Sequence, residues 1–388
     1  MEINKRKFYR QVFALVIPMA LQNLINVGVT AADVLMLGRV SEKVLSGASL
    51  AGQIQFVMTL ILFGTTSGAT VLTAQYWGKK DTQTIEKILG MGMTIGVSCA
   101  ALFTIVAEII PEVLLHIYTS DPAVIAEGVK YLRIVALSYV LMAATQVYLY
   151  IMRSIEQVVI ATVVYSASLV CNVLVNALLI FGLFGLPKMG IMGAAIGTLV
   201  ARILELVIVV IYIIKDKKIE LFKQKLLQSD DSLRKDYMKA AMPIILAQIL
   251  WGVSVPMQTA ILGHLSDDAI AANSVATTFY QYLKVIVIAM TSASAVMMGN
   301  GVGRGNMKRI RSDARTLATI DVAVGIVLGI ILFALKNPLL SMYQLSGEAL
   351  RLADHLIVIM SFVMVGMSYQ MPVSAGIIQG GGDTKFNM

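Results

Sequence analysis

The segment Leu37-Gly38-Arg39-Val40-Ser41 ends the first long apolar run of the chain. Leu262-Gly263-His264-Leu265-Ser266 ends another such run 225 positions later. Pro18 and Pro243, which stand early in the two runs, keep the same offset. Further pairs at this offset are Ser49 and Ser274, Ala51 and Ala276, Thr66-Ser67 and Thr291-Ser292, and Gly78-Lys79 and Gly303-Arg304. A constant offset over this distance indicates two homologous halves, an arrangement from which many secondary transporters are built.

The composition indicates a membrane protein. Hydrophobic residues make up 57% of the 388 positions and charged residues only 14%, whereas soluble domains carry roughly 25% charged residues. Runs of about 20 apolar residues are long enough to cross a bilayer. We therefore predict ten transmembrane helices, at Val12–Leu37, Ser46–Leu72, Ile88–Ile110, Gly128–Met152, Val158–Phe181, Gly190–Ile214, Met238–Leu262, Ala269–Met298, Ala314–Leu335 and Ala353–Ile378.

The predicted fold is an all-α, polytopic membrane protein with two homologous helical-bundle lobes. The first lobe spans residues 1–214 and has six helices. A polar cytoplasmic linker follows at 215–237, and the second lobe, at 238–388, has four helices. By the repeat, the second lobe lacks the counterpart of Val158–Ile214, so we expect the sequence to be a truncated version of a twelve-helix protein.

The distribution of charge predicts the topology. The net charge is +8, and most basic residues fall in segments that lie on one side if the N-terminus is cytoplasmic. This is the positive-inside bias of multi-pass proteins of the cell membrane, and it accounts for the charge without a nucleic-acid partner. The run Val12–Leu37 has a mid-chain repeat partner, so it is predicted to be a permanent helix and no signal peptide. Cys99 and Cys171 lie within predicted spans, and no spacing of Cys or His indicates a metal site.

A polar stripe runs along the first predicted helix. Its members are spaced by four, four and three positions, which places them on one helical face: Gln22, Asn26, Thr30 and Asp33. Ionisable groups inside a membrane are costly and are usually functional. Asp33 is therefore a candidate for binding a coupling cation, with the other three lining a cavity. The alternative is that Asp33 is solvated at the outer interface.

A second polar stripe lies on the fifth predicted helix and consists of Tyr165, Ser168, Asn172 and Asn176. Asn side chains can both donate to and accept from a carboxyl group, so Asn172 and Asn176 suit a site whose protonation changes. Ordinary hydrogen bonding between helices would produce the same pattern.

Other intramembrane charges are assigned simpler roles. Arg202 and Glu205 are three positions apart and are expected to pair with each other. Asp321 is expected to be structural because Arg315 is close in the sequence. Lys284 is a candidate for lining a cavity in the second half, since it shares a helical face with Thr277, Gln281 and Thr291.

Pro18 and Pro243 are predicted hinges, because a proline inside a helix removes a backbone hydrogen bond and permits a bend.

Missing motifs restrict the function. The sequence contains no GxxxxGK[ST] motif for ATP, no potassium-channel filter and no catalytic constellation of side chains. It is therefore predicted to be no enzyme and to need no cofactor. An ion gradient is left as the energy source.

Several of these motifs resemble those of the multidrug and toxic compound extrusion (MATE) transporters. The resemblance rests on the spacing from Pro18 to Asp33, the loops Gly78-Lys79-Lys80-Asp81 and Gly303-Arg304-Gly305-Asn306, Asn172, and Gly381-Gly382-Asp383-Thr384. It covers the whole chain and is greatest for the DinF-type branch of that family.

The resemblance implies an antiporter that expels amphipathic, often cationic compounds in exchange for protons or sodium ions. Asp33 matches the coupling carboxyl of the DinF-type members, Asn172 matches an Asn of the fifth helix, and Thr198 matches a Thr that lines the cavity. Asn176 stands where the family often has an Asp. Trp251 and Ser368 stand where NorM-type members place two sodium-binding carboxyls, so that second-lobe site is predicted to be absent.

The leading hypothesis is thus a monomeric, cation-coupled multidrug antiporter embedded in the lipid bilayer, with proton or sodium ion as the coupling ion. The alternative is a flippase for lipid-linked oligosaccharide or polysaccharide intermediates. A flippase would be expected to place several Arg residues in its cavity, and Arg202 and Lys284 are the only intramembrane bases predicted here.

Overall fold

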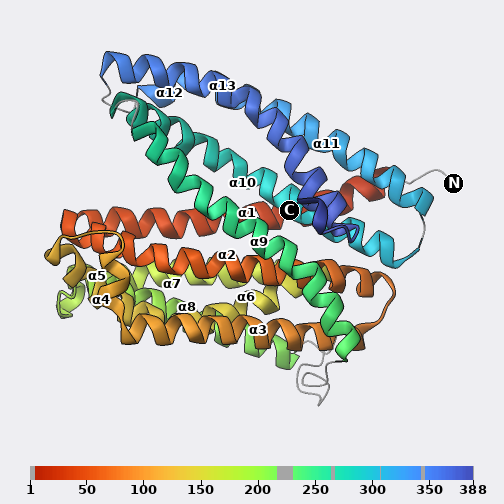
Figure 1. Cartoon of the computed structure of the whole chain (residues 1–388), viewed down its shortest axis with the longest axis horizontal. Coiled ribbons are helices and arrows are strands. Elements are labelled where there is room, and N and C mark those ends of the chain that lie inside the picture. Colours follow the sequence, from red (N-terminus) through yellow and green to blue (C-terminus); the bar gives the residue numbers. More distant parts are fainter. Residues whose placement is uncertain (1–4, 216–229, 264–266, 306, 342–345, 388) are drawn as a thin grey trace. The chain divides into compact units, whose positions relative to one another are not determined.

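The computed structural model describes residues 5–215, 230–263, 267–305, 307–341 and 346–387. Within these ranges the chain is helical and has no β-strand (Figure 1). The long helices are α1 (Lys5–Gly38), α2 (Glu42–Gly78), α3 (Thr82–Ile109), α5 (Pro122–Ala136), α6 (Ser138–Ser154), α7 (Val159–Phe181), α8 (Ile191–Lys215), α9 (Asp231–Gly263), α10 (Asp267–Gly303), α11 (Met307–Ala334) and α13 (Gly347–Met371). Shorter elements are α4 (Pro111–His116), α12 (Lys336–Leu340), the π-helical segment η3 (Pro372–Ile378), and the 3-10 turns η1 (Leu183–Gly185) and η4 (Lys385–Asn387).

The predicted all-α membrane fold is confirmed. Among the described residues, nine helices are long and apolar enough to cross a membrane. A tenth crossing results if the bent pair α5 and α6 counts as one span. Each of the ten predicted spans has its counterpart among these elements. The predicted fourth span, Gly128–Met152, is the one that the structure breaks, with a bend of 48° between Pro122–Ala136 and Ser138–Ser154.

The break between α5 and α6 falls at Leu137 and involves no proline. At this point the hydroxyl of Thr104 on α3 donates to the carbonyl oxygen of Ala136, at 2.8 Å. The hydroxyl of Ser138 donates to the carbonyl oxygen of Val135, at 2.6 Å. Side-chain hydroxyls thus satisfy carbonyl groups where the regular helical ladder is interrupted, which is how bends are tolerated in membrane helices.

The described residues form two compact units. Unit 1 comprises Met1–Leu24, Ala74–Lys79 and Leu246–Met388, and unit 2 comprises Ile25–Thr73 and Lys80–Ile245. This grouping differs from the predicted lobe boundaries, because the start of α1 belongs with the later helices and the start of α9 belongs with the earlier ones. The predicted linker, 215–237, falls mostly on residues outside the described ranges. Its last part is helical, since α9 begins at Asp231.

Both predicted hinges lie inside helices that continue past the proline, Pro18 in α1 and Pro243 in α9. In each helix the division between the units follows a few residues after the proline. Their role as hinges stays a prediction.

The core of unit 2 is built from α2, α3, α5 and α6. Met58 and Leu62 of α2, Leu132 of α5 and Tyr139 of α6 are fully buried in one cluster. Glycines of α2 allow the first part of α9 to pack closely against α2 in this unit. A Cβ on Gly68 would lie 2.6 Å from the Cα of Ala241. Such small residues let transmembrane backbones approach closely.

The core of unit 1 is built from α10, α11 and α13. Ala272 and Val275 of α10, Leu332 of α11 and Ile357 of α13 share one apolar cluster. A second cluster joins Phe8 and Val12 of α1 to Met298 and Leu317, which explains why the start of α1 belongs to this unit.

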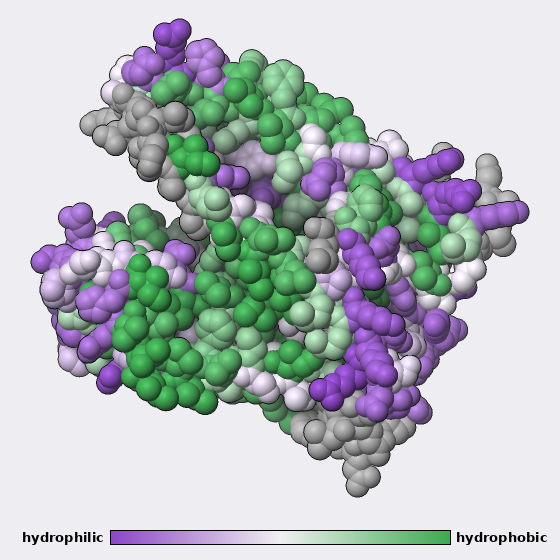
Figure 2. Space-filling view, viewed as in Figure 1, coloured by the Kyte–Doolittle hydropathy of each residue, from purple (hydrophilic) through white to green (hydrophobic). Residues whose placement is uncertain are grey.

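The surface of the helices is apolar where a membrane would surround it. Figure 2 shows hydrophobic residues over the middle of the helices and hydrophilic residues gathered near their ends on the visible face. Large side chains such as Ile17, Leu35, Val163 and Phe362 are exposed. In water this exposure would be unfavourable, whereas in a bilayer these side chains meet lipid chains.

Candidate functional site

Unit 2 contains a cavity of about 540 Å³. It lies among α1, α2, α5, α6, α7 and α8. Its polar lining includes Asn26, Thr30, Asp33, Gln53, Gln55, Tyr131, Gln146, Tyr165, Ser168, Asn172, Thr198, Arg202 and Glu205. Its apolar lining includes Val34, Leu37, Phe56 and Met142. Pockets of this size and mixed lining take small organic molecules.

The predicted coupling residues meet beside this cavity, which Asp33 and Asn172 line and Asn176 does not. The side-chain amide nitrogen of Asn176 donates to a carboxylate oxygen of Asp33, at 2.6 Å. The same nitrogen lies 3.2 Å from the side-chain oxygen of Asn172, which accepts its second hydrogen bond. Asn172 and Asn176 are buried, with exposures of 2% and 0%, whereas Asp33 is only partly buried and borders the cavity. Helices far apart in the sequence thus present one carboxyl group to an open space and fix its orientation.

Close packing of α7 on α8 positions these amides. Gly193, Gly197, Ala201 and Glu205 follow one another at four-residue intervals along α8, and all four are buried. A Cβ on Gly193 would lie 2.7 Å from the carbonyl carbon of Leu179, and one on Gly197 would overlap the side chain of Asn176. This small-residue face lets α7 approach α8 closely, as GxxxG sequences do in membranes.

One turn further along, the α7–α8 contact becomes polar. Arg202 donates to both carboxylate oxygens of Glu205, at 2.8 and 2.9 Å. The hydroxyl of Ser168 donates to Glu205 as well, at 2.5 Å. The predicted pairing of Arg202 with Glu205 is confirmed, but the pair also lines the cavity, which the sequence did not predict.

This pairing decides the charge of the cavity. Arg202 and Glu205 neutralise each other, so among the residues that line the cavity Asp33 is the one whose charge has no opposite partner in an ion pair. A partly buried carboxylate on the wall of such a cavity attracts a cation or a proton.

Not every predicted residue reaches the cavity. Gln22 belongs to the other unit and is fully buried. The polar stripe of α1 is thus divided, with Asn26, Thr30 and Asp33 at the cavity. Asn23 takes part in unit 1 instead: its amide donates to the carbonyl oxygen of Val285, at 3.4 Å.

Gln281 and Lys284 also belong to unit 1. Gln281 is exposed, and the ammonium group of Lys284 lies 5.9 Å from the ring centre of Trp251. These two residues therefore do not line the cavity of unit 2. A cavity in the second half stays a prediction.

Several cavity residues were missed from the sequence. Gln53, Gln55, Tyr131 and Gln146 line the cavity from α2, α5 and α6. Tyr131 and Gln146 lie within the broken fourth span. The signal that could have found Gln53 and Gln55 is their position inside the predicted span Ser46–Leu72, because an amide in hydrocarbon needs a partner or water.

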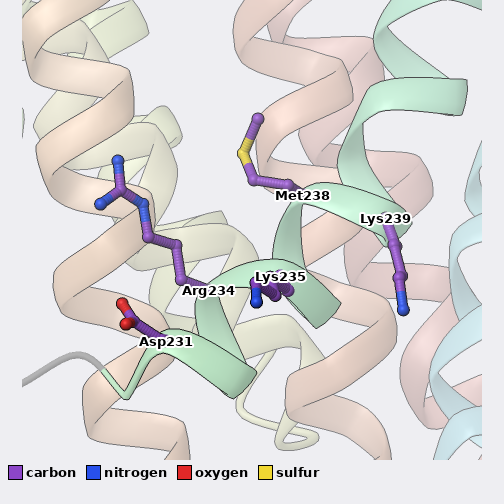
Figure 3. Close-up of a pocket in the computed structure, with 5 residues that line it drawn as sticks. All are labelled: Asp231, Arg234, Lys235, Met238 and Lys239. Carbon is purple, nitrogen blue, oxygen red and sulfur yellow. The ribbon is translucent and has the colours of Figure 1, made fainter.

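A second hollow, of about 610 Å³, lies at the start of α9 and is lined by Asp231, Arg234, Lys235, Met238 and Lys239. All five side chains are exposed, and Figure 3 shows Arg234 and Lys239 extending away from each other. The basic groups do not converge on a common point, so this surface offers no defined binding geometry.

Among the described residues, no group of three or more His, Cys, Asp or Glu side chains could hold a metal ion. Cys99 and Cys171 are free thiols.

Comparison with known proteins shows which family the sequence resembles. The sequence model of the MatE family matches residues 18–178 and 243–388. The chain is 25% identical over 387 residues to a probable multidrug resistance protein NorM of Agrobacterium fabrum, across 97% of this chain and 82% of that relative. It is 21% identical over 360 residues to the probable multidrug resistance protein YoeA of Bacillus subtilis, across 92% of this chain and 78% of that relative.

Solved structures show the same fold. The outward-facing conformation of a multidrug resistance MATE family transporter of the MOP superfamily superposes with a TM-score of 0.88 at 14% identity, over 97% of this chain and 83% of that one. A MATE in the bent conformation gives a TM-score of 0.87 at 14% identity, with the same coverage.

Proposed function

Because the chain belongs to the MatE family of membrane transporters, we propose that it exports amphipathic, often cationic organic compounds across the cell membrane in exchange for protons or sodium ions. The observation that carries this proposal is the carboxyl group of Asp33, held by Asn176 at 2.6 Å on the wall of a cavity of about 540 Å³.

The chemistry of the cavity supports competition between ion and substrate. Asp33 supplies one negative charge, and it can be neutralised either by a coupling ion or by a cationic substrate, but not by both at once. The apolar side chains of Phe56 and Met142 and the amides of Gln55 and Gln146 offer contacts to an amphipathic molecule. Export driven by a gradient follows if ion binding from outside displaces the substrate.

The amide of Asn176 can act as a hydrogen-bond partner of Asp33 in both protonation states. An amide donates to the ionised form of Asp33 and can accept from the protonated form after its side chain rotates. Both states of the carboxyl group therefore have a partner, which a coupling site requires.

The flippase alternative has less support. A lipid-linked pyrophosphate would need several cationic groups that converge in the cavity. Arg202 is the one basic side chain among the residues that line it, and its guanidinium is paired with Glu205. The charge of the cavity therefore favours a cation over a polyanion.

The proposal includes a cytoplasmic N-terminus, as the positive-inside bias predicts. Inside-out membrane vesicles that contain the full chain should then accumulate ethidium, a lipophilic cation, when the vesicle interior is made more acidic, or richer in sodium ions, than the medium outside.

Asp33→Asn tests the site. We expect gradient-driven ethidium uptake to fall to background, because the amide cannot carry the charge that ion and substrate exchange. Glu42→Gln is the matched control, since Glu42 is an exposed carboxyl at the start of α2. Uptake by Asp33→Asn equal to that of the unmodified chain would contradict the assignment, as would a chain that responds to neither gradient.

A further inference from the structure

Asp321, on α11 in unit 1, is the second carboxyl group that needs an explanation. Its side chain has an exposure of 0%, and neither carboxylate oxygen has a hydrogen-bond partner among the described residues. Arg315, which is close in the sequence, does not provide one, because it is exposed and Asp321 has no ion pair or hydrogen bond among the described residues.

The surroundings of Asp321 on its own helix are apolar. One turn before it, Leu317 packs with Phe8, Val12 and Met298. After it, Val324 and Leu328 pack with Val287 and Met364. An ionised carboxylate without a partner in such an interior costs so much free energy that the group takes up a proton or a cation instead.

A second orphaned polar group lies close by on α13. Ser368 also has an exposure of 0%, and its hydroxyl has no partner among the described residues. A Cβ on Gly325, one helical turn from Asp321, would lie 2.9 Å from the hydroxyl oxygen of Ser368. Residues four apart share a helical face, so Asp321 and Ser368 belong to the same α11–α13 contact.

The backbone of α13 is irregular at this level. Pro372 has no N–H, so the carbonyl oxygen of Ser368 lacks its usual donor four residues on. From Pro372 to Ile378 the helix widens into η3, and π-helical turns are frequent at functional sites. The antiparallel contact of α11 with α13, in which Gly329 meets Ser361 and Gly325 meets Ser368, brings Asp321 toward the start of η3.

We infer that Asp321 is a second proton-binding carboxyl of this transporter, which holds an exchangeable proton at the α11–α13 contact with Ser368 as its partner. The neutral acid has one O–H donor and one carbonyl acceptor. The hydroxyl and the carbonyl oxygen of Ser368 can satisfy both, directly or through a water molecule.

The number of oxygen atoms favours a proton over a metal cation. Cations that prefer oxygen take about six ligands. The two carboxylate oxygens of Asp321 and the two oxygens of Ser368 fall short of this number, and the apolar side chains around them add none. A proton needs a single acceptor.

Other charged groups lie elsewhere in the elements that pack on α11. On α10, Lys284 lies against Trp251. On α12, Lys336 pairs with Asp354 of α13, at 2.8 Å. The remaining charged residues of α13, Glu348, Arg351 and His355, lie in its first three turns, away from Ser368. On α11 itself, Arg309 pairs with Asp313, at 3.6 Å. The segment Pro372–Ile378 has no charged residue, and the basic residues at the start of α1, Lys7 and Arg10, precede the apolar contacts of Val12.

The proton would leave Asp321 only when water or a cationic group reaches it. Separation of α11 from α13 at Ser368 would allow this, so the packed contact stores the proton and its opening releases it. This inference rests on the proposed transport function and adds a second proton-binding site to the one at Asp33. Whether Asp321 carries a proton does not depend on Asp33.

Difference infrared spectroscopy tests the inference on the full chain in lipid, because neutral carboxylic acids absorb apart from carboxylates. In an Asp33→Asn background, Asp321→Asn should remove the absorption of one buried acid near neutral pH. Asp313→Asn, on the same helix, should leave it in place. No change on Asp321→Asn would overturn the inference, as would loss of the band when sodium ions are added at constant pH.

A second pair of variants covers the case in which Asp321→Asn does not fold. Ser368→Ala should shift the frequency of the acid band because the proton loses its partner. Ser361→Ala should leave the frequency unchanged, since the hydroxyl of Ser361 donates to Ile357 of its own helix, at 2.8 Å. An unshifted band in Ser368→Ala would contradict the role of Ser368.

Exchange is measured separately. Proteoliposomes that transport ethidium should move about one proton fewer per turnover with Asp321→Asn than without it. An unchanged proton count would mean that the proton does not exchange, which contradicts the inference even if the acid band is lost. The infrared band is read in an Asp33→Asn background. Its absence there would therefore contradict the inference about Asp321 without bearing on the role proposed for Asp33.

Discussion

At the scale of single residues, a glycine decides the geometry of the proposed coupling site. Asn176 can donate to Asp33 only because its amide lies directly over Gly197 of the neighbouring helix, where a Cβ would overlap it. The carboxyl group, the amide and the glycine therefore act as one unit, although the three residues lie on three different helices.

We expect Gly197→Ala to impair coupling without removing any polar group. The added methyl group must displace Asn176 from Asp33, and overpacking of this kind costs about 1–3 kcal/mol. Since 1.4 kcal/mol corresponds to about tenfold in an equilibrium, gradient-driven ethidium uptake should fall by roughly tenfold. Gly28→Ala on α1 is the control, because a Cβ at Gly28 meets nothing within 4 Å. Equal uptake by both variants would show that Asn176 does not position Asp33.

At the scale of elements, the bend between α5 and α6 places Tyr131 and Gln146 on the cavity wall. The bend is stabilised from α3, where Thr104 donates to the carbonyl oxygen of Ala136. A hydroxyl has a single proton, so this bond between helices competes with the bond to Ala100 of its own helix, at 3.0 Å.

Thr104→Val should lower the thermal stability of the purified protein, because a buried carbonyl left without its donor costs about 1–3 kcal/mol. Thr94→Val is a matched control on the same helix, since Thr94 donates only within α3, to Gly90 at 2.9 Å. The measurement is the unfolding temperature in detergent. A larger loss for Thr94→Val than for Thr104→Val would disprove the stabilising role of Thr104.

At the scale of the whole molecule, the sequence repeat is visible in a contact inside unit 1. Gly78 of α2 and Gly303 of α10 are repeat partners, and a Cβ on either would lie 2.9 Å from the Cα of the other. Each Cβ would also overlap a carbonyl group, that of Asn300 for Gly78 and that of Gln75 for Gly303, which are repeat partners in turn. The two halves thus meet here through equivalent backbone atoms.

This symmetry predicts that Gly78→Ala and Gly303→Ala have similar effects. Neither site can take a methyl group without a backbone shift, and overpacking of this kind lowers the free energy of unfolding by about 1–3 kcal/mol. Both variants should therefore lower the yield of folded protein and its unfolding temperature to a similar extent. Gly52→Ala, in the middle of α2, serves as the stability control, because nothing lies within 4 Å of a Cβ there. If one variant behaves like Gly52→Ala and the other does not, the contact is not equivalent in the two halves.

The sequence by itself determined the membrane class, the ten spans, the repeat, and the polar stripes of α1 and α7. These features depend on local periodicity and hydropathy, which each segment carries alone. The stripes predicted Asp33, Asn172 and Asn176 together because a polar face in a membrane must find protein or water. The division of the polar face of α1, with Gln22 in one unit and Asp33 in the other, cannot be read from its spacing.

Only the tertiary structure decided which groups are paired. Three-residue spacing correctly joined Arg202 to Glu205, because both lie on one helix. Nearness in the sequence did not join Asp321 to Arg315, because Asp321 is buried and Arg315 is exposed. Whether a buried charge is neutralised depends on the helices that pack against it, and that packing joins residues far apart in the chain.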